Sequence, residues 1–442
     1  MKQLTRLALV FSLFLASGLA AHAQDAPEAT LRGVVSNACK AAERSPALSP
    51  ALCDLGGVER RHVTGDIFEY SFRLKVGEGE HDLIKIHRVV REKRPGVPRK
   101  TDRALFMLHG DLWGFDGAFL GSTLSGAVPR EQAVAAFMAG RDVDVWGVDL
   151  RWTNVPADTT DFTFMKDWNL STHVRDLGVA LGVARAVRVF TGSGPGRLAL
   201  MGWSRGGIIA YAYAGEETRL PEQLRHVDAL IPVDIAFKLG AQHEEQRAAA
   251  CVRYAANKQQ LDAGQYHSPQ GVAVQTIGLL ASTDAGGSSP LPGFEGLTNA
   301  QAALLVGSAT HVLFGPFPPV PAYHFNAGEF DASGLPAGLQ FTREPYLYDF
   351  FKAASPFQSF TEQVESEALL CGGEQSPDLP YDDRLGEINV PVLYVGAAGG
   401  FGEFGLDTLA LLGSTDVSSH VVRLHPAEAR AVDFGHADIF MA

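Results

Sequence analysis

Residues 197–206 read Arg-Leu-Ala-Leu-Met-Gly-Trp-Ser-Arg-Gly and give the strongest indication of the fold. Arg197–Met201 predicts a short buried strand, and the small residues of Gly206–Gly215 predict a helix. Gly202–Gly206 fits G-x-S-x-G, a motif that is weak alone in a chain with 47 glycines. Its place between a strand and a helix makes it specific, because this sharp turn strains the serine backbone and needs glycine on either side. We interpret Ser204 as a candidate nucleophile; the alternative is a tight turn with a solvated serine.

On both sides of this stretch, predicted strands alternate with predicted helices. Ala104–Leu108 is a continuous apolar run, typical of a strand buried on both faces. Leu170–Thr191 has helical spacing, and Ser171 and Thr172 can cap its start. The other predicted elements are strands at Ile67–Val76, Leu83–Val90, Val143–Val148, Val227–Val233, Val390–Val395 and Ser419–Leu424, and helices at Arg130–Gly140 and Leu406–Leu412.

Such alternation predicts an α/β fold, with a mostly parallel central sheet and helices on both faces. It stops for roughly 150 residues that are rich in Gly and Pro. We therefore expect an inserted helical and loop cap within the sheet domain. The expected boundaries are a signal peptide at 1–23, an irregular lead-in at 24–66, a core formed by 67–236 and 386–442, and the cap at 237–385.

Four motifs together resemble the α/β-hydrolase superfamily over about residues 67–234 and 388–442. They are His109-Gly110 after a buried strand, Gly147–Arg151 after the next, Gly202–Gly206, and Gly435-His436 near the end. The resemblance implies that the backbone N–H groups of Asp111 and Arg205 form an oxyanion hole. The Asp111 side chain departs from the usual apolar residue, so it must point away or bond elsewhere. His109 is expected to shape the turn rather than transfer protons.

The resemblance also implies a histidine base and an acidic partner. His436 lies beyond the last predicted strand, where the superfamily places its base, and His425 and His420 are weaker competitors. In the usual acid loop, residues 396–402, glycine stands where an Asp is expected.

Some lipases and haloalkane dehalogenases instead place their acid after the preceding strand, which here offers Asp234. We assign Asp234 to orient His436 and keep Glu403 as the alternative acid; Asp234 as a helix cap or a contact to the inserted cap is the structural alternative. A serine nucleophile excludes dehalogenase chemistry. Because few residues follow His436, we expect its loop to be less firmly held.

The N-terminus predicts export. Lys2 and Arg6 precede an apolar run of about a dozen residues, and Ala21-His22-Ala23 is a small-x-small cleavage site; an uncleaved anchor is the alternative. The net charge would move from −13 to −15 on cleavage, because the signal peptide holds two basic residues and no acidic one.

An even number of cysteines in an exported chain suggests two disulfides. We favour the pairs Cys39–Cys53, close in sequence, and Cys251–Cys371, by elimination.

The sequence thus favours an exported serine hydrolase that cleaves carboxylic esters with an apolar moiety. An amidase or peptidase with the same triad, and a non-catalytic binding protein on this scaffold, remain alternatives.

The acidic, scattered charge argues against nucleic acid and anionic membranes as partners, and no long apolar run predicts a membrane span. We find no cofactor motif and no metal cluster; His81 and His87 read as ordinary strand residues, too far apart to chelate one ion.

Overall fold

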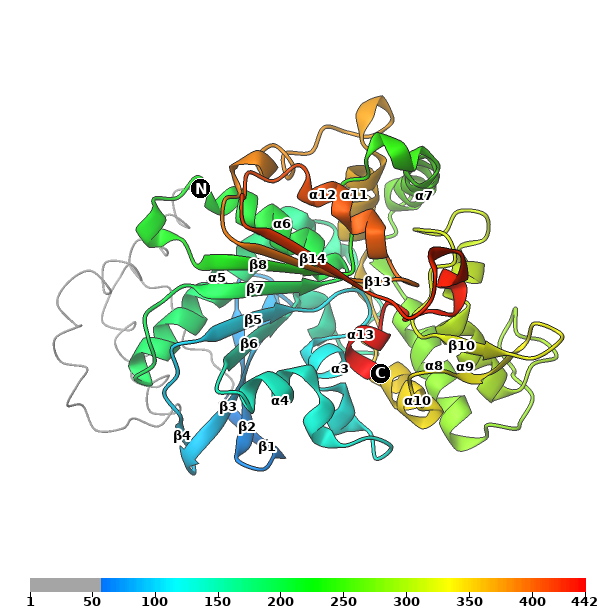
Figure 1. Cartoon of the computed structure of the whole chain (residues 1–442), viewed down its shortest axis with the longest axis horizontal. Coiled ribbons are helices and arrows are strands. Elements are labelled where there is room, and N and C mark those ends of the chain that lie inside the picture. Colours follow the sequence, from blue (N-terminus) through cyan, green and yellow to red (C-terminus); the bar gives the residue numbers. More distant parts are fainter. Residues whose placement is uncertain (1–56) are drawn as a thin grey trace.

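The computed structural model describes residues 57–442, which form a ten-stranded sheet flanked by helices (Figure 1). The strand order is β1-β2-β3-β6-β5-β7-β8-β13-β14, with β4 beside β3. Neighbours from β6 to β14 pair in parallel, and β1, β2, β3 and β6 pair antiparallel. The strands are β1 Glu59–Thr64, β2 Ile67–Lys75, β3 Leu83–Arg94, β4 Val97–Pro98, β5 Ala104–Leu108, β6 Asp144–Asp149, β7 Leu198–Trp203, β8 Val227–Val233, β13 Val392–Ala397 and β14 Val417–Val422.

The central strands are buried on both faces, which explains their continuous apolar runs. Along β5, Leu105 and Met107 join one hydrophobic cluster, and Phe106 and Leu108 join the other. The helices on the first face are α3 (Phe115–Phe119), α4 (Val134–Ala139) and α13 (Asp438–Met441); those on the second are α5 (Leu170–Phe190) and α6 (Arg205–Glu217). The expected α/β architecture is confirmed.

The segment between β8 and β13 forms a mainly helical insertion at one end of the sheet (Figure 1). Helix α7 packs on α11, and α8 packs on α9 and α10. A disulfide joins Cys251 on α7 to Cys371 on α11. The elements of the insertion are α7 Glu244–Asp262, β9 His267–Ser268, α8 Gln270–Thr283, α9 Asn299–Ser308, β10 Gly328–Phe330, β11 Pro336–Leu339, α10 Glu344–Lys352, β12 Gln358–Ser359 and α11 Phe360–Cys371; short α12 (Leu406–Leu409) follows β13.

Several local expectations are wrong. The lead-in is not irregular throughout, because Glu59–Thr64 is a strand paired with β2. His81 lies in the turn before β3 and not in a strand. Helix α5 is capped by Asn169, whose side chain accepts from the Thr172 N–H, instead of by Ser171 or Thr172. The predicted signal peptide and the Cys39–Cys53 pair lie outside the described residues.

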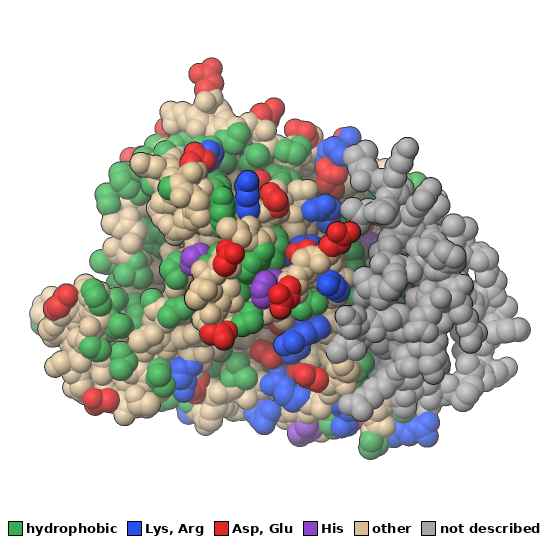
Figure 2. All heavy atoms as spheres, turned by 180° about the vertical axis from the view of Figure 1, so that it is seen from behind, with side chains coloured by type: hydrophobic (Ala, Val, Ile, Leu, Met, Phe, Trp, Pro, Cys, Tyr) green, Lys and Arg blue, Asp and Glu red, His purple; other side chains and the backbone are tan. Residues whose placement is uncertain are grey.

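Residues 57–442 contain no helix long and apolar enough to cross a bilayer. On the face shown in Figure 2, acidic and basic side chains are interspersed with hydrophobic ones. The apolar stretch of the insertion carries exposed side chains, Val312, Leu313, Phe314 and Phe317, each at least 38% exposed. These four side chains therefore do not fill the core of the insertion.

Candidate active site

The turn from β7 into α6 places Ser204 at the carboxyl edge of the sheet. Its backbone angles, φ 56° and ψ −133°, lie in a region that non-glycine residues rarely adopt. The Ser204 N–H donates to the Val233 carbonyl at 2.9 Å, which fixes the turn against β8. A Cβ at Gly202 or Gly206 would overlap backbone atoms, so both glycines are required by space. The predicted strained serine turn is therefore present.

The loop after β5 lies directly against this turn. A Cβ at Gly110 would stand 2.5 Å from the Ser204 Cβ and 3.1 Å from its Oγ. The next residue, Asp111, is therefore close to the serine, which is where the expected oxyanion donor has to lie. The side chain of Asp111 does bond elsewhere, because it pairs with Arg205.

The imidazole of His109 is buried, and each of its two ring nitrogens has a backbone hydrogen-bond partner. One ring nitrogen, Nδ1, lies 2.9 Å from the Gly110 carbonyl, and Nε2 accepts the Leu150 N–H at 3.1 Å. Burial is the main cause that lowers the pKa of His109. A neutral ring with both nitrogens occupied fits a residue that shapes the turn.

Asp234 follows the last residue of β8 and is 0% exposed. Its carboxylate accepts backbone N–H groups from Ala397 (2.8 Å), Gly402 (2.9 Å) and Phe401 (3.1 Å). A fourth bond, 2.6 Å long, joins Asp234 Oδ2 to Nδ1 of His436. Four partners satisfy a buried charge that would otherwise be strongly unfavourable.

The glycine-rich loop after β13, residues 396–402, therefore surrounds the Asp234 carboxylate and contains no carboxylate of its own. A Cβ at Gly400 would overlap Asp234 Oδ2, so only glycine leaves room for the carboxylate. Glu403 comes next in this loop, but its side chain is 42% exposed and forms an ion pair with Arg423. The structure thus brings Asp234, and not Glu403, to His436.

His436 is buried beside the serine turn. Its ring stacks on Trp203, the residue before Ser204, with centroids 5.0 Å apart. When Nδ1–H donates to the carboxylate, Nε2 remains free to accept a proton. Among the described residues the Ser204 hydroxyl has no hydrogen-bond partner, and serine–histidine bonds are often loose before substrate binds. His420 is exposed on β14, and His425 lies in the loop that follows it.

A short part of the insertion, residues 322–327, holds the His436 loop; we name it the strap. The His436 N–H donates to the His324 carbonyl (2.9 Å), and the Ala437 N–H to the Phe325 carbonyl (2.8 Å). The carboxylate of Asp438 accepts from Asn326 and from the Ala327 N–H. Contrary to expectation, the loop is firmly held. Nothing in the sequence pattern marks the strap, since its partners lie more than 100 residues away.

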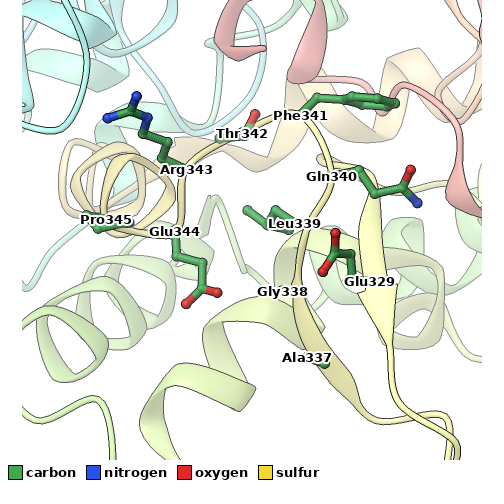
Figure 3. Close-up of a pocket in the computed structure, with 10 residues that line it drawn as sticks. All are labelled: Glu329, Ala337, Gly338, Leu339, Gln340, Phe341, Thr342, Arg343, Glu344 and Pro345. Carbon is green, nitrogen blue, oxygen red and sulfur yellow. The ribbon is translucent and has the colours of Figure 1, made fainter.

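A surface hollow lies elsewhere, on the β10–β11 hairpin and the start of α10 (Figure 3). Its volume is about 530 Å³. Polar side chains such as Glu329 and Glu344 line it, and it contains no predicted site residue. We therefore assign the site to the serine turn and not to this hollow.

His87 is the centre of a buried ion network rather than an ordinary strand residue. Its Nδ1 lies 2.6 Å from Glu69, and its Nε2 lies 3.0 Å from Asp149. Burial opposes the charged ring, but these carboxylates outweigh it and raise the pKa of His87 to about 10. Glu69, His87 and Asp116 also place possible metal ligands within 4.8 Å of one another, but Arg61 pairs with both carboxylates. The guanidinium supplies the positive charge that a metal would bring.

Comparison with solved structures places this arrangement in a known fold. A candidate lipase from Sulfolobus solfataricus aligns with a TM-score of 0.54 and 17% identity, over 87% of this chain and 94% of its own. Two weaker likenesses are a carboxylesterase from the thaumarchaeon Nitrososphaera gargenis (TM-score 0.40, 12% identity, 80% and 92% covered) and the thioesterase domain of the curacin pathway (0.38, 13%, 87% and 99%).

No protein-family profile and no curated protein sequence matches the chain. The fold therefore rests on topology and on the first of these structural likenesses. The mostly parallel sheet of this chain, the helices on both of its faces and the serine turn after β7 are typical of the α/β-hydrolase fold. The chain has the α/β-hydrolase fold.

Proposed function

We propose that the protein is a serine hydrolase that cleaves carboxylic esters through an acyl-enzyme on Ser204. The observation that carries the proposal is the 2.6 Å bond between Asp234 and His436, beside a serine in a strained turn. A nucleophilic hydroxyl needs an imidazole to take its proton, and the imidazole needs a carboxylate to fix its tautomer. The lipase and esterase neighbours agree with this chemistry.

In the proposed mechanism, Ser204 Oγ attacks the ester carbonyl carbon while its proton moves to Nε2 of His436. The carbonyl oxygen becomes an oxyanion, which accepts the backbone N–H groups of Asp111 and Arg205. Collapse breaks the bond to the alcohol, which leaves with the proton from His436. Water then repeats the sequence on the acyl-enzyme and frees the acid and Ser204. Asp234 holds the ring and stabilises its charged form throughout.

We further propose that the substrate is a small ester with an apolar moiety and that the enzyme is exported. Exposed Phe314 and Phe317 on the insertion support the first point. The ring centroids of Phe314 and Tyr323 lie 6.3 Å apart, and those of Tyr323 and His436 lie 5.3 Å apart. Phe314 of this apolar stretch therefore lies near the proposed site. The Cys251–Cys371 disulfide supports export, because disulfides persist mainly in oxidising compartments.

A substrate panel tests the proposal. Purified protein is offered p-nitrophenyl esters of graded acyl length, lactones and aminoacyl amides, with Ser204→Ala as the control. We expect ester hydrolysis that the substitution abolishes, with a preference for apolar acyl chains. Faster turnover of the amides would instead identify an amidase or peptidase with the same triad.

A further inference from the structure

The two residues proposed as oxyanion donors are also joined through their side chains. Arg205 Nε lies 2.5 Å from Asp111 Oδ1, and Arg205 Nη2 lies 2.8 Å from Asp111 Oδ2. Such a two-bonded pair fixes both the distance and the plane between its partners. It therefore links the β5–α3 loop to the start of α6 beside Ser204.

The loop that carries Asp111 needs such a tether. Leu112 adopts a positive φ of 68°, and the Trp113 N–H returns to the Asp111 carbonyl at 2.8 Å. A non-glycine residue in this region costs free energy and persists only when its surroundings hold it. The Asp111–Arg205 pair is one such constraint.

The insertion supplies further constraints on the same loop. Gln358 on β12 donates its amide N–H to Asp111 Oδ1, and its Oε1 has no hydrogen-bond partner among the described residues. The Ser355 N–H donates to the Leu112 carbonyl at 2.6 Å. Trp113 Nε1 donates to the Phe350 carbonyl at 2.7 Å. The insertion thus contacts the β5–α3 loop, which carries Asp111, directly.

Charge gives the pair a second effect. An unpaired carboxylate at position 111 would repel the negative oxygen of a tetrahedral intermediate. Burial opposes the charge of Arg205, but Asp111 outweighs it and raises the pKa of the guanidinium further. The arginine is therefore charged at every working pH and neutralises Asp111.

We propose that the side chains of Asp111 and Arg205 are positioning residues that set the spacing of the oxyanion hole, and that Gln358 connects this pair to the insertion. The inference rests on the proposed serine-hydrolase function. It adds a way in which the insertion controls the rate of reaction without touching the reacting atoms.

The affinity for a trifluoromethyl ketone tests the oxyanion hole directly, because the bound ketone carries an oxyanion. Ser204 Oγ adds to its carbonyl carbon, the proton moves to His436, and the carbonyl oxygen becomes the oxyanion. We expect Arg205→Met to lower kcat about 100-fold with little change in KM, and to weaken ketone binding in proportion, as for loss of one oxyanion donor. The double variant D111N/R205M should have a kcat about tenfold higher than that of Arg205→Met, because the unpaired charge of Asp111 is gone. Gln358→Leu, which removes one bond to a charged group, lowers kcat about tenfold.

Arg60 and Glu92 provide a matched control, because they form the same two-bonded pair on β1 and β3, at 2.7 and 2.6 Å. Glu92→Gln should leave kcat and ketone affinity unchanged.

If Arg205→Met does not fold, Arg205→Lys replaces it, because lysine keeps the charge but cannot form the two parallel bonds of the guanidinium. A fall in ketone affinity in Arg205→Lys still supports the inference. Variants at 111 and 205 that match Glu92→Gln would overturn it while wild-type esterase activity stands. A wild type that neither hydrolyses esters nor binds the ketone overturns the proposed function itself.

Discussion

Asp234 stands at the end of β8, one strand before the position where the superfamily usually carries its acid. The carboxylate accepts three backbone N–H groups and one imidazole N–H within 3.1 Å, so its position is fully determined by its surroundings. Glu403, in the usual loop, instead pairs with Arg423 near solvent. Two carboxylates that both looked plausible in the sequence thus have clearly different environments.

Replacing these two acids separates their roles. Asp234→Asn keeps the shape but lets the amide favour the wrong tautomer of His436, so we expect kcat to fall on the order of 10⁴-fold. Glu403→Gln removes only a surface ion pair and should change kcat less than twofold. Steady-state kinetics on the best ester of the panel measures both. The opposite ranking would contradict the assignment of Asp234.

At the scale of elements, the serine turn and the strands around it were predictable, because their signals are local. Glycine at 202 and 206, a buried strand before them and small residues after them leave few other structures for Ser204. The strap and Gln358 were not predictable, because their partners are distant in sequence and no spacing rule joins them. Asp234 was proposed because it follows a predicted strand and because glycine stands where the usual loop would carry an Asp.

Gly400→Ala tests the fit of this glycine loop around the acid. The new methyl group would overlap Asp234 Oδ2 and push the carboxylate or the loop aside. Because a displacement of about 1 Å in a catalytic group can cost about 100-fold in rate, we expect a loss of that size in kcat. Gly286→Ala is the control, since its Cβ meets nothing within 4 Å. Equal kinetics for the two folded variants, checked by circular dichroism, would show that the loop does not constrain the acid.

At the scale of the whole molecule, the disulfide closes a loop of the insertion with a sequence separation of 120. That loop contains both the strap and Gln358, so it includes the main contacts of the insertion with the site. The double variant C251S/C371S should lose about 2–4 kcal/mol in the free energy of unfolding. Denaturation of wild type with and without reductant provides a second measure. An unchanged midpoint in both experiments would exclude a stabilising role for this bond.

The ion network around His87 gives a pH dependence of stability. The pKa of this ring rises from 6.5 to about 10 on folding, against burial, through Asp149 and Glu69. The stabilisation is complete below pH 6.5, where both states hold the proton, and is lost as pH rises toward 10. We expect urea denaturation to show a free energy of unfolding that falls between pH 6.5 and 9.5. His87→Gln should flatten this slope; parallel slopes would contradict the role of His87.

The most direct test of the proposed triad of Ser204, His436 and Asp234 is covalent labelling with a fluorophosphonate probe, mapped by mass spectrometry in the folded protein. We predict modification at Ser204 alone, with a rate that falls by orders of magnitude in Asp234→Asn and is unchanged in Glu403→Gln. A folded wild type that the probe does not modify at Ser204 would contradict the catalytic triad and favour a binding protein on a hydrolase scaffold.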